Sequence, residues 1–353
     1  MTQSATERDI RTQFNMVRKA LPATLARESS IHKAAAQHGA AVIFTGCGSS
    51  YYIAQSGAAA FRAFTRHDRV QALPASEVTL YWPYWAPAGP PHASTLIPIS
   101  RSGDTSETIS AIQAYKERTQ GMVMAVTCAQ NGEMARTLPG AIVMPESDEP
   151  NVVMTRSATS MLYALTLMGA MWAGDDAAIK RMESVPEAAR AAFESSEKAI
   201  SQAIGDRIPE KIVYLGGGPF YGLAEEGKLK VKEMSLASSE AYHPLEFRHG
   251  PMSMADSGML IVLIASDSGL AGEAKLISHM KSFGVRTLVI HDRPCEELAC
   301  ADYSVFINSG LPEHERLAAY LPVLQLIAVY ITKARGLDPD HPRNLSKVVV
   351  LKS

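Results

Sequence analysis

The stretch Ala41-Val-Ile-Phe-Thr-Gly-Cys-Gly-Ser-Ser50 decides the fold, because it returns later in the chain as Lys211-Ile-Val-Tyr-Leu-Gly-Gly-Gly-Pro-Phe220. Each copy is a short apolar run followed by Gly-x-Gly and then by a helical pattern. This sequence of features is typical of a buried parallel strand that turns into a helix. The repeat therefore predicts two copies of one α/β unit.

Three more pairs of segments recur in the same order along the chain. Residues 95–108 (TLIPISRSGDTSET) are echoed by 259–272 (MLIVLIASDSGLAG), residues 121–127 by 284–290, and residues 141–145 by 304–308. Such repetition indicates duplication of a whole structural unit. We expect two tandem α/β lobes, each a parallel sheet flanked by helices in a flavodoxin-like three-layer sandwich.

The length of 353 residues accommodates two domains of roughly 150 residues each. The predicted organisation is a helical segment at 1–29, a first lobe at 30–175, a linking helix at 176–205, a second lobe at 206–335, and a tail at 336–353 that closes the active site. The linking segment is charged and alanine-rich, and Pro186 breaks its helical pattern.

The composition is that of a globular protein, with 46% hydrophobic residues, 20% charged residues and a formal net charge of -2. This balance excludes a basic face for nucleic acid. We find neither an apolar signal region nor a run of about 18 apolar residues, and we therefore expect no membrane segment and a cytoplasmic location. The four cysteines lack the paired spacing of zinc sites, so we expect reduced thiols and neither a metal nor a cofactor.

Hydroxyl and glycine residues cluster at two strand-to-helix turns of the first lobe. Ser49 and Ser50 follow the glycines of the first turn, and Ser100-Arg-Ser-Gly-Asp-Thr105 forms the second. Free N–H groups at a helix start, together with hydroxyl donors, suit a phosphate, and Arg101 would add a charge-assisted pair. The same residues also serve as helix caps and turns. Two such turns in register within one lobe favour the phosphate site.

The second lobe keeps these turns and loses most of the donors. Pro219 and Phe220 stand where the first lobe has two serines, Asp267 replaces the arginine, and Ala271 replaces the threonine. An aspartate repels a phosphate. We therefore expect one phosphate site, in the first lobe, and a degenerate copy of it in the second.

The second lobe instead carries a dense run of ionisable groups between Glu225 and His249. On a helix Glu226, Lys230 and Glu233 share one face, because they are three and four residues apart. A carboxylate beside a lysine predicts a proton-transfer base. A run of charges is also typical of a solvated helix with surface salt bridges.

The C-terminal stretch from Gly336 to Lys347 is rich in turn residues and precedes the apolar run VVVL. We expect such a segment to dock against the rest of the chain. An ordinary edge strand after a loop is the alternative.

Five motifs together resemble a known family. TGCGSS, SRSGDTSET, KLKVKE, EFRHGP and DHPRNLSK follow the order of the isomerase half of glucosamine-6-phosphate synthase, within the SIS (sugar isomerase) domain family. The resemblance spans residues 30–353, and the last three motifs are far more specific than the glycine turns.

The resemblance implies a small-molecule sugar phosphate as the ligand. The substrate-binding positions that it implies are Ser49, Ser50, Ser100, Arg101, Ser102, Thr105, Val153, Arg343 and Ser346. Arg101 stands where the synthase has glutamine.

The resemblance also implies four catalytic residues. Glu233 matches the base that moves a proton between C1 and C2, and Lys230 matches a lysine near the reacting atoms. His249 matches a ring-opening histidine that reaches in from a neighbouring subunit, which implies a homodimer. Lys347 matches a tail lysine that forms a Schiff base with a keto sugar. Aldose–ketose isomerisation requires these types of residue, because a carbon-bound proton is removed and an enediolate charge develops.

Two departures from the synthase pattern separate this chain from it. No glutaminase domain with a cysteine near its start precedes the first lobe, so we do not expect ammonia release from glutamine. The stretch from Asn151 to Ser160 places Arg156 and Ser157 where substrate contacts are expected, and it resembles stand-alone family members.

We therefore expect a stand-alone phosphosugar isomerase and deaminase that converts glucosamine 6-phosphate to fructose 6-phosphate and ammonia. One alternative is a deglycase of phosphorylated sugar-amine adducts or an isomerase of another sugar phosphate. Another is a non-catalytic sugar-phosphate sensor, although the first 30 or so residues are too few for a DNA-binding domain.

Overall fold

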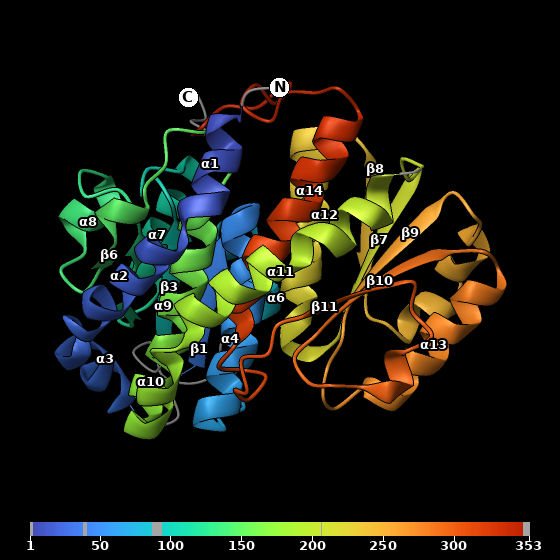
Figure 1. Cartoon of the computed structure of the whole chain (residues 1–353). Coiled ribbons are helices and arrows are strands. Elements are labelled where there is room, and N and C mark those ends of the chain that lie inside the picture. Colours follow the sequence, from blue (N-terminus) through green and yellow to red (C-terminus); the bar gives the residue numbers. More distant parts are fainter. Residues whose placement is uncertain (1–2, 38–40, 87–93, 206, 349–353) are drawn as a thin grey trace. The chain divides into compact units, whose positions relative to one another are not determined.

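The computed structural model describes residues 3–37, 41–86, 94–205 and 207–348, and the chain divides into two compact units. The first lobe comprises Thr12–Glu183 with Ser346–Ser353, and the second lobe comprises Met1–Arg11 with Ser184–Leu345. Each lobe has its own parallel sheet flanked by helices (Figure 1). The prediction of two tandem α/β lobes is confirmed.

The sheet of the first lobe is parallel and has the order β2-β1-β3-β5-β6, with β4 also paired to β3. Its described strands are β1 (Ala41–Gly46), β2 (Val70–Pro74), β3 (Ser94–Ser100), β4 (Met122–Val123), β5 (Val126–Thr127) and β6 (Ile142–Val143). Every residue of β1 and β3 is buried, as expected for central strands covered on both faces. The winding direction of this sheet changes between β1 and β3.

Helices pack tightly against this sheet. The helices described in the first lobe are α2 (Phe14–Leu25), α3 (Glu28–Ala35), α4 (Ser49–Thr65), α5 (Ala75–Leu80), α6 (Trp82–Trp85), α7 (Ser106–Arg118), α8 (Glu133–Thr137), α9 (Arg156–Ala173) and α10 (Asp176–Met182). Residues of α5 and α7 join Ile43, Leu96 and Tyr115 in one core cluster. Helices α4 and α9 pack so closely that a Cβ at Gly57 would lie 2.8 Å from Leu165 Cδ1.

The sheet of the second lobe repeats this topology. Read as β8-β7-β9-β10-β11, its order matches that of the first lobe, with β10 in the place of β4 and β5. Its described strands are β7 (Lys211–Gly216), β8 (Ser238–Tyr242), β9 (Met259–Ile264), β10 (Arg286–His291) and β11 (Tyr303–Phe306). The internal repeat seen in the sequence is therefore a repeat of topology.

The helices described in the second lobe are α1 (Ala5–Thr12), α11 (Val185–Gly205), α12 (Tyr221–Ser235), α13 (Leu270–Ser282) and α14 (Leu321–Ala334). Helix α13 contributes Ile277 to a core cluster with Leu263 and Phe247. Helix α12 packs on β7, β8 and α14, while α11 packs on α14, β10 and β11.

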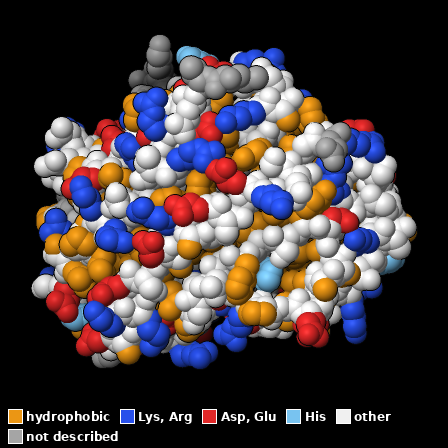
Figure 2. Space-filling model, viewed as in Figure 1, with side chains coloured by type: hydrophobic (Ala, Val, Ile, Leu, Met, Phe, Trp, Pro, Cys, Tyr) orange, Lys and Arg blue, Asp and Glu red, His pale blue; other side chains and the backbone are white. Residues whose placement is uncertain are grey.

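One stretch among the described residues, Leu317–Ala334, is long and apolar enough to cross a membrane by composition. It includes α14, and 83% of it is buried within the structure. That burial is typical of the core helix of a globular lobe. On the face shown in Figure 2, acidic and basic side chains are interspersed and form no basic field.

The tail is attached to the N-terminal helix within the second lobe. The Asp340 carboxylate accepts hydrogen bonds from the backbone N–H groups of Ala5 and Thr6, each at 2.7 Å, and so caps the start of α1. Helix α14, which precedes the tail, also holds α1 through an ion pair of 2.7 Å between Lys333 and Glu7. Burial raises the pKa of Asp340, but its hydrogen bonds with Thr6 and Ala5 outweigh that effect and hold the pKa below its ordinary value.

We predict that Asp340→Ala lowers the free energy of unfolding by about 1 kcal/mol, the usual effect of losing an N-cap. Because the folded pKa is depressed, the contribution is complete above the unfolded pKa near 3.9 and is lost as the pH falls through the folded value. Urea unfolding of wild type and variant at neutral pH and at about pH 3 measures both effects. Asp68→Ala, at a side chain that is 94% exposed, is the control and should leave stability unchanged.

Candidate functional site

The predicted phosphate cradle lies at the carboxyl ends of β1 and β3, where the winding of the first sheet changes direction. Ligands of doubly wound sheets bind at such a switch point, because the two neighbouring connections leave on opposite faces. Helix α4 begins at Ser49 directly after β1, and α7 begins at Ser106 shortly after β3. Both helix starts therefore direct N–H groups to this edge of the sheet.

Three hydroxyl groups converge in the turn between β3 and α7. Ser100 Oγ lies 2.9 Å from Thr105 Oγ1 and 3.4 Å from Ser102 Oγ, and the last two hydroxyls are 3.5 Å apart. Within the turn, the N–H of Gly103 donates to Ser100 Oγ at 3.1 Å. Thr105 is the N-cap of α7, although its side chain makes no capping hydrogen bond. The hydroxyl cluster is therefore available to an anion in a way that an ordinary helix cap is not.

The serines of the first turn lie beside this cluster. Ser49 and Ser50 form the start of α4, and each is 4% exposed. A Cβ at Gly46 would lie 2.8 Å from Ser50 Cβ and 2.9 Å from the carbonyl oxygen of Ile99, the residue before Ser100. Glycine at this position thus allows the first turn of α4 to approach the end of β3.

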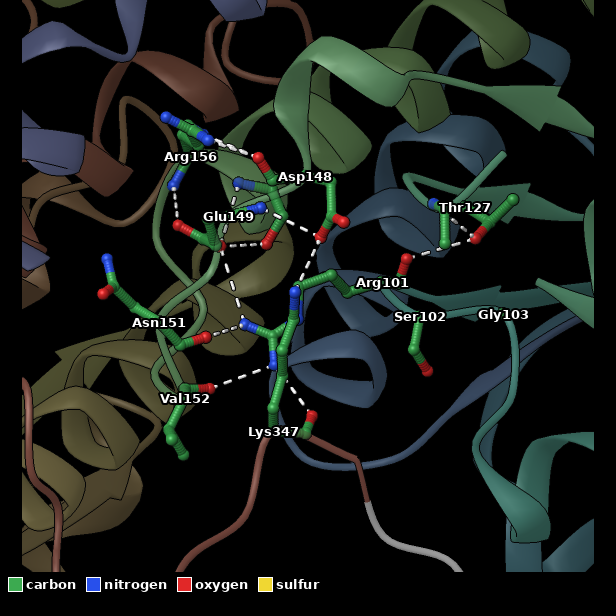
Figure 3. Close-up of polar contacts among 12 residues, drawn as sticks. Arg101, Ser102, Gly103, Thr127, Asp148, Glu149, Asn151, Val152, Arg156 and Lys347 are labelled. Carbon is green, nitrogen blue, oxygen red and sulfur yellow. Dashed lines mark hydrogen bonds and ion pairs between the residues drawn. The ribbon is translucent and has the colours of Figure 1, made fainter. Parts of the chain in front are cut away.

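Arg101 does not point with the hydroxyls of the cradle. Its guanidinium is buried and donates to the carbonyl oxygens of Asn151 at 2.9 Å, Val152 at 3.1 Å and Lys347 at 2.8 Å (Figure 3). We expected Arg101 to form a charge-assisted pair with a phosphate. In the structure its guanidinium instead donates to three backbone carbonyl groups of the protein. Val153, which follows in the same loop, is buried at 1% exposure.

The loop that Arg101 contacts is organised by the buried carboxylate of Glu149. That carboxylate accepts from the N–H groups of Thr155, Arg156 and Ser157 at 2.8 to 3.3 Å, and also from the hydroxyls of Thr155 and Ser157. It therefore caps α9. Arg156 donates to the carbonyl oxygen of Asp148, so both Arg156 and Ser157 have protein partners here.

The corresponding turn of the second lobe is filled by the chain's own carboxylates. Glu313 accepts from the N–H of Asp267 and from the hydroxyl of Ser268. The buried carboxylate of Glu273 accepts from the N–H and the hydroxyl of Ser266, each at 2.9 Å. These acidic groups accept from donors that a phosphate would otherwise use in this turn.

The second group of predicted residues lies on α12. Lys230 is fully buried, and its Nζ lies 2.6 Å from Glu233 Oε2 and 3.3 Å from Glu226 Oε1. Burial opposes the charge of Lys230, but the two carboxylates outweigh burial and raise its pKa above the ordinary value. Because Lys230 and Glu226 are both 0% exposed, the alternative of a solvated surface helix is wrong.

Glu233 remains accessible at the edge of this buried group, with 19% of its side chain exposed. It lines a pocket of about 210 Å³ with residues of the tail, among them Arg343 and His341. The structure therefore brings Glu233 and Arg343 together within the second lobe. His341 was not among the predicted site residues, although it lies in the DHPRNLSK motif. It pairs with Asp338 at 2.7 Å.

The other predicted catalytic residues, His249 and Lys347, are not among the side chains that line this pocket, and neither is Ser346. His249 is exposed on a turn after a short 3-10 helix, Glu246–Arg248. Ser346 and Lys347 belong to the first lobe, where Lys347 Nζ lies 3.4 Å from Asp148 Oδ1. Within the described residues, no group of three His, Cys, Asp or Glu side chains is placed to hold a metal ion.

Residues 208–331 match the SIS domain family. This match covers most of the second lobe. The first lobe repeats the topology of the second, and relatives of known sequence confirm the predicted resemblance of this chain to the synthase family. Glutamine–fructose-6-phosphate aminotransferase (isomerizing) of Sulfurisphaera tokodaii is 29% identical over 256 residues, and that of Pyrobaculum aerophilum is 30% identical over 270. Each match covers 72% of this chain and 42% or 43% of the relative, so the chain spans less than half of these relatives.

Solved structures of several sugar-phosphate enzymes share the fold over nearly the whole chain. Tagatose-6-phosphate ketose/aldose isomerase from Escherichia coli superimposes with a TM-score of 0.84 and 23% identity, covering 97% of both chains. The C-terminal domain of glucosamine-fructose-6-phosphate aminotransferase from Francisella tularensis gives 0.82 and 22%, covering 97% of this chain and 99% of that one. Glucosamine-6-phosphate deaminase from Thermotoga maritima gives 0.73 and 25%, covering 94% and 100%.

We predict that Lys230→Met destabilises the protein by about 3–5 kcal/mol, because it leaves Glu226 buried without its ammonium partner. The free energy of unfolding in urea measures this effect. Lys180→Met is the matched control, since Lys180 is 78% exposed and its pair with Glu183 lies at the surface. Equal stability of the two variants would contradict a buried Lys230.

Proposed function

We propose that this protein is a phosphosugar aldose–ketose isomerase that acts on an amino-sugar phosphate, converting glucosamine 6-phosphate and water to fructose 6-phosphate and ammonia. The observation that carries the proposal is the carboxylate of Glu233, which is held against the buried ammonium of Lys230 and opens to a pocket. A phosphate cradle alone would suit any phosphosugar binder. A fixed, accessible carboxylate is what proton transfer at carbon requires.

The phosphate of the substrate is assigned to the hydroxyl cluster of Ser100, Ser102 and Thr105, with Ser49 and Ser50 at the neighbouring helix start. Phosphate oxygens accept several hydrogen bonds at once, which matches three hydroxyls within 3.5 Å of one another and two helix N-termini. Binding energy at the phosphate then positions the reacting end of the sugar.

Glu233 is assigned to the transfer of a proton between C1 and C2. Its Oε2 hydrogen bond with Lys230 fixes the orientation of the carboxylate, and the raised pKa of Lys230 keeps that lysine an ammonium. A nearby cation also stabilises the negative charge of the enediolate. His249 is assigned to ring opening from a second subunit and Lys347 to a Schiff base with the keto sugar, both on the resemblance of their motifs.

A second candidate is isomerisation of a different ketose phosphate. It is favoured by the similarity to the structure named tagatose-6-phosphate ketose/aldose isomerase, which extends over 97% of this chain. This reaction would use the same phosphate cradle and the same base, and it would release no ammonia.

The test is incubation of the purified protein with glucosamine 6-phosphate or tagatose 6-phosphate in deuterated water, followed by NMR. We expect deuterium at the carbon that gains a proton, C1 when an aldose becomes a ketose and C2 in the opposite direction, with ammonia and fructose 6-phosphate from the amino sugar. Glu233→Gln should lower the rate by roughly 10²–10⁴-fold, the usual contribution of a general base. Glu210→Gln, at a carboxylate that is 67% exposed, should leave the rate unchanged.

The outcomes separate the candidates. Exchange and isomerisation without ammonia would favour the second candidate. Binding of both sugars in wild type, with neither exchange nor any product, would refute an isomerase and leave a sugar-phosphate sensor.

We predict that Thr105→Val raises the KM for a phosphosugar roughly tenfold or more, because the loss of a hydrogen bond to a charged group costs about 1.5–3 kcal/mol. Valine keeps the shape of threonine, so the fold should persist. Thr137→Val is the control, since the Thr137 hydroxyl donates only to a helix carbonyl at an exposed position. If inorganic phosphate competes equally well in wild type and in Thr105→Val, the cradle is not the phosphate site.

A further inference from the structure

A buried arginine connects the phosphate cradle to the C-terminal tail within the first lobe. Arg101 lies between Ser100 and Ser102 in sequence, and its guanidinium donates at 2.8 Å to the backbone carbonyl of Lys347, 246 residues away. In Figure 3 the side chain of Arg101 reaches the tail, while that of Ser102 points in a different direction. Two neighbouring residues of one turn thus face different features: Ser102 faces the cradle, and Arg101 faces the tail.

The chemistry of the guanidinium explains why arginine suits this position. It is planar and carries five N–H donors, so one side chain reaches three carbonyl oxygens from two separate segments. It is 4% exposed, and the carboxylate of Glu149 lies 3.9 Å from its Nη1, so its charge is balanced inside the lobe. A side chain so fully occupied is a fixed part of the framework.

The tail is held at Lys347, the residue whose amine the proposed function assigns to a Schiff base. The backbone carbonyl of Lys347 is bound by Arg101, and its Nζ lies 3.4 Å from Asp148 Oδ1. About a third of the Lys347 side chain, 36%, stays exposed. Its backbone is thus fixed while its amine remains accessible.

We infer that Arg101 is a positioning residue that fixes Lys347 relative to the phosphate cradle. A phosphosugar bound through Ser100 and Ser102 would have its reactive end at a set distance from the phosphate, and Arg101 sets where the lysine amine stands with respect to the same turn. The role assigned to the amine rests on the proposed function. The attachment of the tail does not.

The first experiment measures the attachment alone, without any sugar. Endoproteinase Lys-C cleaves the peptide bond formed by the Lys347 carbonyl, the atom that Arg101 holds, and mass spectrometry detects loss of the residues after it. We expect cleavage at Lys347 to be roughly tenfold faster in Arg101→Met, because local opening becomes easier. Cleavage after Lys180, which is 78% exposed, should proceed at the same rate in both proteins.

Arg101→Lys is the second variant, because Arg101→Met leaves the carboxylate of Glu149 without its neighbouring cation and risks unfolding. Lysine keeps the charge and reaches fewer carbonyls. We expect an intermediate rate of cleavage at Lys347, measured well below the melting temperature of each protein. Unchanged protection of Lys347 in a folded Arg101→Lys and in a folded Arg101→Met would overturn the inference.

The second experiment measures the position of the amine. With fructose 6-phosphate, deprotonated Lys347 Nζ adds to the keto carbon, water leaves, and borohydride then delivers hydride to the C=N bond to give a stable secondary amine. We expect wild type to form this adduct, Lys347→Met to form none, and Arg101→Lys to form much less. The kcat of Arg101→Lys should fall by roughly 10²-fold while its KM stays within about a factor of two of wild type. A merely structural role would lower the melting temperature without this split.

The two experiments distinguish the two ideas. Faster cleavage at Lys347 in the variants, with no adduct and no turnover in wild type, would support the attachment and refute the proposed function. Turnover and adduct formation in wild type that are unchanged in both variants would support the function and refute the positioning role of Arg101.

Discussion

The backbone N–H groups and hydroxyls at the turn after a central parallel strand need hydrogen-bond acceptors. This requirement applies in both lobes. The strand ends, the helix has not yet begun, and free N–H groups and hydroxyls gather at one edge of the sheet. The second lobe satisfies them internally, because Glu313 and Glu273 accept from residues 266 to 268. In the first lobe the hydroxyls of Ser100, Ser102 and Thr105 mainly face one another. The same topology thus gives a closed turn in one copy and an open cradle in the other.

A second constraint fixes each turn to the segment before the last long helix of its lobe. In the first lobe Arg101 binds carbonyls of residues 151 and 152, shortly before α9. In the second lobe Asp267 forms a two-pronged pair with buried Arg316 at 2.8 and 3.1 Å, shortly before α14. The residue at this position of the turn is thus positively charged in the first lobe and negatively charged in the second, but in both lobes it attaches the turn to the segment before the helix. Asp267, which would repel a phosphate, is therefore also a structural partner of Arg316. Burial raises the pKa of Asp267, but the hydrogen bond with Arg316 outweighs burial and lowers the pKa below its ordinary value.

The central part of the fold could be predicted from the sequence, because β1, β3, β7 and β9 are buried on both faces and read as apolar runs. The edge strands β2 and β8 could not, since their residues are mostly half-exposed and their sequences, VQALP and SSEAY, are mixed or polar. The break between β4 and β5 could not be predicted either, because residues 122–126 form one continuous apolar run. In the site, the gathering of Ser100, Ser102 and Thr105 followed from their spacing. The direction of Arg101 did not, because its partners lie 50 to 246 residues away.

Helix α12 shows most clearly why pattern alone cannot separate a surface helix from a buried one. Spacings of three and four residues put Glu226, Lys230 and Glu233 on one face whether that face is wet or dry. Burial is decided by tertiary packing: a Cβ at Gly227 would lie 2.7 Å from the Tyr214 ring, so α12 lies directly on β7. With the helix that close, Lys230 has no access to water and its charge needs both carboxylates. Glu226 balances the charge of Lys230 inside the core and is itself fully buried. Glu233 also pairs with Lys230, but it lies at the edge of the buried group and still presents its carboxylate to a pocket.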